Sequence, residues 1–224
     1  MTCQACDLNI LCQRLGILDD MPKTYHEQIL QLPLSHKVIT VKKGETVYQP
    51  GNSFKDIYSL RAGSIKSLSP EGQILQFHYQ GDLFGIDGIE DNKYALNSIA
   101  LEDSFICAFS FIDILSQLKK EDYWALTKIM SRKYRESLLH LDFHDSAQKR
   151  LIHFLMNFSD KKQKYGFSKF KFTLPMKRGD LANYLNLKIE TLSRLLHDLI
   201  EEKIILVNNK EVTILDYQAL QNLI

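Results

Sequence analysis

The chain has 224 residues, of which 45% are hydrophobic, and its formal net charge is +1. Its length suits one large domain or two small ones, and its composition is that of an ordinary globular protein. The longest apolar runs are too short to cross a bilayer, and the first residues lack the basic and apolar regions of a secretory signal. These features exclude a membrane-spanning protein and predict a cytoplasmic one without a membrane partner.

Between residues 38 and about 111, glycines recur in turn-like pairs, as at Pro50-Gly51 and Ala62-Gly63. Short β-rich runs lie between these pairs, and the run 75–79 alternates apolar with polar residues. Short strands joined by regular turns predict an antiparallel barrel or roll.

From about Asp113 the apolar residues follow a helical period instead. They form one stripe at steps of three or four residues: Tyr123, Leu126, Met130, Tyr134, Leu138 and Leu141. Such a stripe is consistent with a helix that packs on its own roll and with a coiled-coil seam between two chains. Because the stripe is longer than most helices and has polar flanks, we favour a dimer seam.

The C-terminal part predicts a different module. A helix is expected from about Asp145 to Phe158, followed by a polar surface loop at 159–164. Residues 179–202 predict two amphipathic helices that a tight turn at Leu185-Asn186-Leu187 separates. The apolar runs 204–207 and 212–215 flank the turn pair Asn208-Asn209 and predict a hairpin. Together these elements make a winged helix-turn-helix.

The charge distribution singles out the same part of the chain. Residues 161–210 contain eleven Lys or Arg and five Asp or Glu, a net charge of +6, which leaves −5 for the remainder. A basic module attached to an acidic remainder is the layout expected when one end of a protein meets the phosphates of DNA.

Two faces are predicted for the second helix of the motif. The packing face contains Ile189, Leu192, Leu196 and Leu199, and the opposite face contains Glu190, Ser193, Arg194 and His197. In a major groove, Arg194 could donate two hydrogen bonds to a guanine, and Glu190 could accept one from a cytosine. The alternative for this pair is a solvated salt bridge, because the two residues are four positions apart.

Three of the four cysteines, Cys3, Cys6 and Cys12, crowd together, and the fourth is Cys107. Four cysteines are too few for a disulfide scaffold in a chain of this size, whereas four thiolates suit a [4Fe–4S] cluster or a structural zinc ion. Zinc usually takes paired C-x-x-C units and only Cys3 and Cys6 fit that form, so the spacing favours iron–sulfur. Taken alone, Cys107 is more typical of a small buried hydrophobe.

Several of these motifs resemble one family. The runs Arg178-Gly179-Asp180-Leu181-Ala182-Asn183-Tyr184-Leu185 and Glu190-Thr191-Leu192-Ser193-Arg194 resemble the winged helix-turn-helix of the CRP/FNR regulators, the second run its FNR branch. Gly81-Asp82-Leu83-Phe84-Gly85 is similar to the family's glycine-rich corner, and the resemblance covers almost the whole chain. Two residues depart from it. Asn186 replaces a glycine and tolerates the same left-handed conformation, whereas Lys188 replaces a capping threonine and could contact a phosphate instead.

The resemblance implies an α+β fold: an N-terminal antiparallel β-roll of the cyclic-nucleotide-binding kind, a long dimerisation helix and a C-terminal winged helix-turn-helix. The corresponding ranges are a cysteine arm with a short helix at 1–36, the sensor roll at 37–112, the dimerisation helix at 113–144 and the DNA-binding domain at 145–224. The implied cluster ligands are Cys3, Cys6, Cys12 and Cys107. The residues assigned to DNA binding are Arg178, Lys188, Glu190, Thr191, Ser193 and Arg194.

By the same resemblance, an intact [4Fe–4S] cluster favours a homodimer that binds a pseudo-palindrome similar to TTGAT-N4-ATCAA, and oxygen weakens that dimer. RNA polymerase is the other expected partner, with the loop Asp87–Asn92 as a candidate contact. The expected function is oxygen-responsive control of anaerobic gene expression. The alternative is a regulator of this family that uses zinc, a thiol–disulfide switch or a small ligand in place of the cluster.

Two other classes of protein are not expected. The nucleotide-binding branch of the family uses an Arg-Ser pair after the corner, and the stretch Lys93–Ser98 contains no arginine. An enzyme is disfavoured because the seven histidines are scattered, and no paired carboxylates, nucleophile elbow or phosphate-binding glycine loop is present in the sequence.

Overall fold

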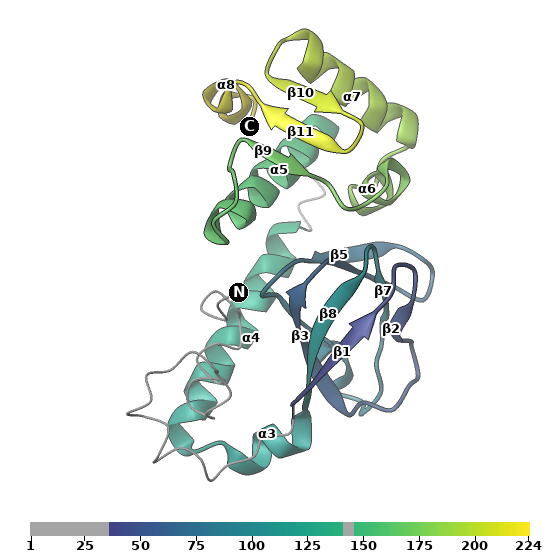
Figure 1. Cartoon of the computed structure of the whole chain (residues 1–224), viewed down its shortest axis with the longest axis vertical. Coiled ribbons are helices and arrows are strands. Elements are labelled where there is room, and N and C mark those ends of the chain that lie inside the picture. Colours follow the sequence, from purple (N-terminus) through teal and green to yellow (C-terminus); the bar gives the residue numbers. More distant parts are fainter. Residues whose placement is uncertain (1–35, 141–145) are drawn as a thin grey trace. The chain divides into compact units, whose positions relative to one another are not determined.

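The computed structural model of the protein describes residues 36–140 and 146–224, and Cys3, Cys6 and Cys12 lie outside these ranges. The chain divides into two compact units, Met1–Leu141 and Asp142–Ile224 (Figure 1). Within the described residues, no helix is both long and apolar enough to cross a membrane.

The first unit contains a β-roll made of two four-stranded antiparallel sheets. One sheet has the order β1 (His36–Val41), β8 (Ser104–Ser110), β3 (Asp56–Ala62) and β6 (Leu83–Phe84). The other has the order β2 (Thr46–Tyr48), β7 (Asn97–Ala100), β4 (Ile65–Leu68) and β5 (Ile74–His78). The predicted antiparallel roll is therefore confirmed.

The core of the roll lies between the two sheets. Leu60, Ile65 and Ile106 are fully buried there, and aromatic rings such as Tyr48 and Phe84 pack against one another. The predicted glycine-rich corner forms a tight turn, because Gly85 adopts φ +84° and a Cβ on it would lie 2.7 Å from the ring of Tyr58. Only glycine fits this position without displacing a core side chain.

Two helices follow the roll, where the sequence pattern predicted one. They are α3 (Phe111–Gln117) and α4 (Lys120–His140), and the backbone is extended at Leu118 between them. The break is stabilised on its far side, since the backbone N–H of Lys119 donates to the carboxylate of Asp122 at 3.0 Å. This is a capping interaction, which the apolar period could not reveal.

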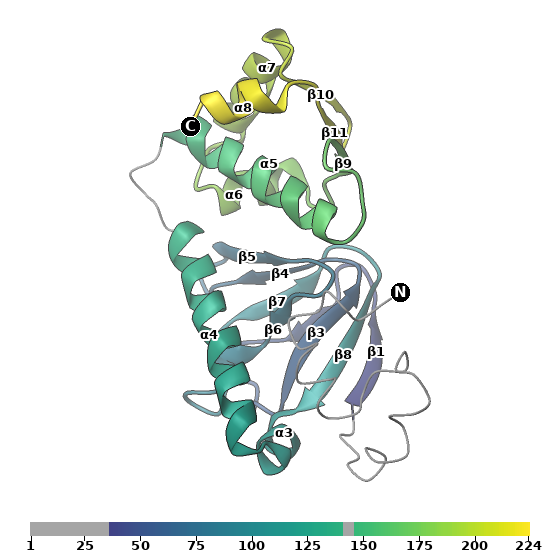
Figure 2. The ribbon, with the colours of Figure 1, turned by 90° about the vertical axis from the view of Figure 1, so that its left-hand side faces the viewer.

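Helix α4 lies along one side of the roll (Figure 2). An apolar cluster joins them, and we call it the helix-contact cluster; its buried members are Ile57, Leu83, Phe109, Ile114 and Ile129. Leu126 packs against this cluster, whereas Tyr123 and Tyr134 of the predicted stripe are exposed. These three members of the stripe thus divide between two faces of α4: one packs on the roll and the other is exposed. Leu141 lies outside the described residues.

The second unit is the predicted winged helix-turn-helix. Its elements are α5 (Ala147–Lys164), β9 (Lys171–Thr173), α6 (Arg178–Tyr184), α7 (Ile189–Glu201), β10 (Ile205–Asn208), β11 (Glu211–Ile214) and α8 (Tyr217–Asn222). Its sheet has the order β10-β11-β9, so the hairpin β10–β11 gains a third strand. The α+β fold class expected from the sequence is confirmed.

One prediction in this unit is wrong. Residues 159–164 were expected to form a loop, but they make up the last turns of α5. Ser159 is fully buried, and its hydroxyl donates to the carbonyl oxygen of Lys169 at 2.6 Å. The three lysines in the last helical turn also suit the negative end of the helix dipole, so a polar composition was here compatible with a helix.

Candidate nucleic-acid interface and cysteine site

The second helix of the motif, α7, has one buried and one exposed side. Leu192, Leu196 and Leu199 are buried, and Glu190, Ser193 and Arg194 are exposed together with His197. Thr191 is half-buried at the boundary. The predicted packing face is wrong at one position, because Ile189 is 45% exposed: it occupies the first turn of α7, beyond the reach of the core.

On the exposed side of α7, the charges of Glu190 and Arg194 do not pair with each other. Among the residues that the structure describes, no ion pair joins Glu190 to Arg194, although His197 lies 3.8 Å from Glu201 one turn further on. The geometry therefore does not favour the salt-bridge alternative for this pair. Both side chains are exposed, which direct base readout requires.

The turn before α7 follows the expected backbone. Asn186 has φ +52°, the left-handed conformation for which the motif usually provides a glycine. Lys188 stands at the N-cap of α7 and makes no side-chain cap hydrogen bond. Its exposed ammonium group is thus left for another role, and a cation beside the helix start suits a DNA phosphate.

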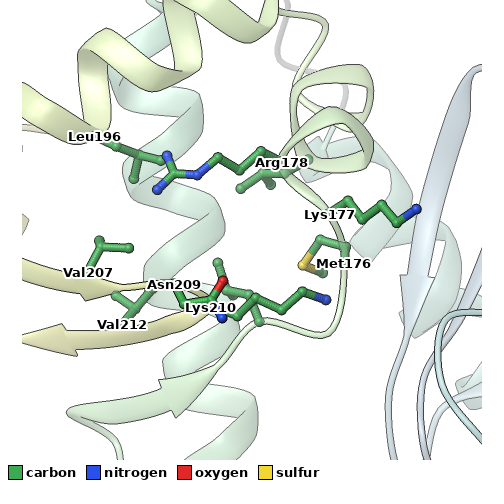
Figure 3. Close-up of a pocket in the computed structure, with 10 residues that line it drawn as sticks. Met176, Lys177, Arg178, Leu196, Val207, Asn209, Lys210 and Val212 are labelled. Atoms are coloured by element: carbon green, nitrogen blue, oxygen red, sulfur yellow. The ribbon is translucent and has the colours of Figure 1, made fainter.

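A pocket of about 300 Å³ lies between the start of α6, α7 and the hairpin β10–β11. Its apolar floor includes Met176, Leu181, Leu196 and Val212, and its rim includes Lys177, Arg178, Asn209 and Lys210. Figure 3 shows Arg178 reaching from α6 toward Leu196, with Asn209 and Lys210 on the hairpin side. The Lys210 ammonium donates to the carbonyl oxygen of Pro175 at 2.8 Å, which fastens the hairpin turn to the segment before α6.

These rim cations show what the sequence reasoning left out. Arg178 was assigned to DNA binding, but Lys177 and Lys210 were only counted in the net charge. The structure gathers all three around one pocket, with no acidic residue in its lining. The hairpin turn also lies one residue later than predicted: Asn208 still pairs with Glu211, so the turn consists of Asn209 and Lys210. A cation in an exposed turn is the kind of residue that contacts phosphates, and this was the available signal.

Cys107 lies on the middle of strand β8. It pairs in register with Val38 of β1 on one side and with Ser59 of β3 on the other, and it is half-buried. Its side chain packs against the helix-contact cluster, in which Ile129 represents α4. The neighbouring apolar residues Val38 and Phe105 are exposed. In the described part of the chain, the thiol of Cys107 therefore lies beside exposed apolar side chains of β1 and β8.

The expected metal site cannot be described as a whole, because three of its four expected ligands, Cys3, Cys6 and Cys12, lie outside the described residues. Within residues 36–140 and 146–224, no group of three or more His, Cys, Asp or Glu side chains is placed to hold a metal ion. Cys107 is the one expected ligand whose position is known.

Comparison with known proteins gives the same two modules. Residues 38–121 match the family described as "Cyclic nucleotide-binding domain", and residues 149–223 match "Crp-like helix-turn-helix domain". The structure is similar to that of FixK2 from Bradyrhizobium japonicum, with a TM-score of 0.75 and 23% identity, covering 85% of this chain and 98% of that one. At this identity the likeness shows the fold.

Curated relatives extend over nearly the whole chain. The "Fumarate and nitrate reduction regulatory protein" of Vibrio cholerae is 33% identical, over 99% of this chain and 89% of the relative. The "Regulatory protein HlyX" of Actinobacillus pleuropneumoniae is 35% identical, over 95% of this chain and 89% of the relative. The matched domains, the exposed face of α7 and these relatives agree on DNA-binding transcription regulation. The chain belongs to the CRP/FNR family of transcription regulators, in its FNR branch.

Proposed function

We propose that the protein is an oxygen-responsive regulator of anaerobic gene expression, whose dimerisation and promoter binding depend on a [4Fe–4S] cluster held by Cys3, Cys6, Cys12 and Cys107. The observation that carries this proposal is the place of Cys107, which packs on the same apolar cluster as α4. The relatives named for fumarate and nitrate reduction support it, because both are anaerobic processes.

Cys107 fits the role of a cluster ligand. It is half-buried, as a thiolate shielded from solvent needs to be, and exposed apolar residues flank it at Val38 and Phe105. The N-terminal arm leads into β1, the strand that pairs with the strand of Cys107. Cys12 precedes this strand by about two dozen residues, which could span roughly 80 Å when extended, so the arm can return to Cys107.

A [4Fe–4S] cluster would be held by these four thiolates and would link the N-terminal arm to the roll through a group that oxygen can degrade. The effect of cluster loss on α4 would pass through residues of the chain itself. Cys107 touches the helix-contact cluster, to which α4 contributes Ile129 and, at its edge, Leu126. Because such a core is close-packed, a shift of Cys107 would reach α4 through the side chains of this cluster.

The open face of α4 supports a homodimer. Tyr123, Thr127, Met130 and Tyr134 follow one another at steps of four, three and four residues, as in a coiled-coil seam. Tyr123 is 48% and Tyr134 67% exposed in the single chain. Large aromatic side chains at that spacing would be covered by the same face of a second copy, which gives a symmetric interface.

Two copies related by symmetry present two α7 helices, and such a pair reads a palindromic site. We assign base contacts to Glu190, Ser193 and Arg194, and backbone contacts to Arg178, Lys188 and Thr191. The proposed site is a pseudo-palindrome similar to TTGAT-N4-ATCAA. RNA polymerase is the proposed further partner, and the proposed location is the cytoplasm, where the DNA is.

The proposed polymerase contact is narrower than the sequence suggested. Glu90, Asp91 and Asn92 are exposed, but Asp87 is only partly so and its carboxylate is hydrogen-bonded within the roll. We therefore place the contact on the last three residues of the loop.

The test is anaerobic purification with iron and sulfide counting, a visible spectrum before and after air, and binding to the palindrome. About four irons and four sulfides per chain are expected, with DNA binding that falls on air exposure. The variant Cys107→Ala should lose both the cluster and the tight DNA binding. The matched control is Val38→Ala, which trims the neighbouring side chain on β1 and leaves all four thiols.

The alternatives give different results. One zinc per chain without sulfide would indicate a zinc site, and metal-free protein whose DNA binding responds to thiol reductants would indicate a disulfide switch. Normal anaerobic binding by Cys107→Ala would rule out the cluster as the controlling element, while leaving the family and the DNA-binding unit unaffected.

A further inference from the structure

Just after the glycine-rich corner, the half-buried carboxylate of Asp87 accepts hydrogen bonds from three donors. One oxygen, Oδ2, accepts from the backbone N–H groups of Ala95 and Leu96, both at 3.0 Å. The other oxygen, Oδ1, accepts from the hydroxyl of Tyr48, also at 3.0 Å. Asp87 belongs to the short 3₁₀ helix η2 (Ile86–Gly88), and its donors come from β2 and from the segment before β7. The contact with Tyr48 joins segments 39 residues apart, whereas those with Ala95 and Leu96 close the loop that leads to β7.

The three donors form the kind of site that holds an anion. Two consecutive backbone N–H groups converging on one oxygen make a concave, partially positive seat. The phenol of Tyr48 is held in place, because the residue is only 3% exposed and its ring stacks on Tyr94 with 4.0 Å between centroids. Burial, and then the charge of Asp87, raise the pKa of Tyr48 well above its ordinary value, so this hydroxyl remains a donor.

The roll matches a family described by cyclic-nucleotide binding, and a cyclic nucleotide is an oxyanion. Nevertheless the anion seat is filled here by the chain itself. We propose that Asp87 is an internal anion that occupies the oxyanion seat of the roll, and that it makes the roll independent of any external anionic ligand. Asp87 thus determines ligand specificity in this unit, because its carboxylate excludes phosphate-bearing ligands from the seat.

The seat is connected to the helix that follows the roll. Ile86, next to Asp87, packs against the helix-contact cluster, as does Leu126 of α4. On the other side of Asp87, Gly88 lies so close to Phe54 that an added Cβ would come within 2.7 Å of its ring. The three hydrogen bonds of Asp87 therefore hold η2 against the same apolar cluster that Cys107 touches. In this protein the carboxylate of Asp87 connects η2 to β2 and to the segment before β7. In a ligand-dependent roll, a bound anion could make this connection.

The test uses the full chain, purified anaerobically, and two variants. Asp87→Ala removes the internal anion and leaves the seat open, whereas Asp87→Asn keeps an uncharged group of the same size in it. The matched control is Asp91→Ala, which removes a carboxylate from an exposed position on the same loop. Thermal unfolding midpoints are measured in inorganic phosphate and in chloride of equal ionic strength, because phosphate also stabilises proteins non-specifically.

The alanine variant should unfold at a lower temperature than the native chain in chloride. Phosphate should raise its midpoint by about 3 °C more than it raises that of the native chain, as expected for an anion that binds the folded state alone. Asp87→Asn and Asp91→Ala should respond to phosphate as the native chain does. An equal phosphate response in Asp87→Ala and the native chain would overturn the proposal.

If Asp87→Ala does not fold in chloride, its refolding yield is measured in place of the thermal unfolding midpoint. Phosphate is then expected to restore folding of this variant, and equal yields in the two salts would overturn the proposal in the same way. All these proteins keep the four cysteines, and the quantity compared is the difference between phosphate and chloride within each protein. The outcome is therefore separable from that of the iron–sulfur proposal.

Discussion

On the recognition helix, single side chains divide between proposed base contacts and proposed phosphate contacts. Arg194 and Glu190 stand on the exposed side of α7 without pairing to each other, and Lys188 stands at its start without capping it. A guanidinium can donate two parallel hydrogen bonds to one guanine, whereas an ammonium acts as a point charge. We therefore assign sequence preference to Arg194 and sequence-independent affinity to Lys188.

The variant Arg194→Ala should lose about 1–3 kcal/mol of discrimination between the palindrome and an unrelated duplex, because a bidentate base contact is removed. Lys188→Ala should instead weaken binding to both duplexes equally and lower the salt dependence by about one phosphate contact. Fluorescence anisotropy with the two duplexes at several salt concentrations measures both effects. Retained preference in Arg194→Ala would mean that this side chain does not read a base.

Helix α4 serves two surfaces at once, and a buried ion pair helps to fix it on the roll. Lys133 of α4 lies 3.8 Å from the carboxylate of Asp82 in the glycine-rich corner, and their side chains are only 7% and 6% exposed. Asp82 also accepts from the backbone N–H of Tyr79 at 2.9 Å. Besides the helix-contact cluster, α4 is thus held by a polar contact in the interior.

Removing one member of this pair should destabilise the protein more than removing both charges. Lys133→Met should destabilise the first unit by about 3–5 kcal/mol, because it leaves the charge of Asp82 buried, and the double variant with Asp82→Asn should recover part of the loss. The control is Lys42→Met, which breaks the exposed pair with Asp103 at 2.9 Å and should change stability little. Denaturant unfolding of these three variants, of the single variant Asp82→Asn and of the native chain measures these effects. Additive losses in the double variant would show that the two groups act separately.

At the scale of the whole molecule, binding to a palindrome depends on the joining of two chains. The second half-site is bound intramolecularly once the first is occupied, so a dimer gains roughly 100-fold or more over separate contacts. The exposed tyrosines of α4 are the part of the described chain best placed to make this junction.

The variant Tyr134→Asp places a charge in the proposed seam. It should bind the full palindrome roughly 100-fold more weakly, while its affinity for a single half-site stays close to that of the native chain. Sedimentation equilibrium should show the corresponding shift toward monomer. Unchanged palindrome binding would place the dimer contact on another surface of the protein.

Much of the architecture was predictable because its signals are local. Asn186 and Asn209 were expected at turn positions, and both adopt positive φ values, of 52° and 56°. The change from a period of two to a period of about four separated the roll from the helices, and the alternation of leucines with charged residues identified the recognition helix. Five of the six residues assigned to DNA binding are exposed, as an interface requires, and the sixth, Thr191, is half-buried.

The sequence by itself thus determined the family fold, the order of its modules and the exposed face of α7, because turn preferences and amphipathic periods depend on neighbouring residues. Only the tertiary structure decided which face of α4 packs on the roll, where the helix breaks at Leu118, and that residues 159–164 stay helical. The same holds for Asp87, whose partner Tyr48 is distant in the chain. Such contacts depend on how strands far apart in the sequence are brought together, and no local pattern encodes them.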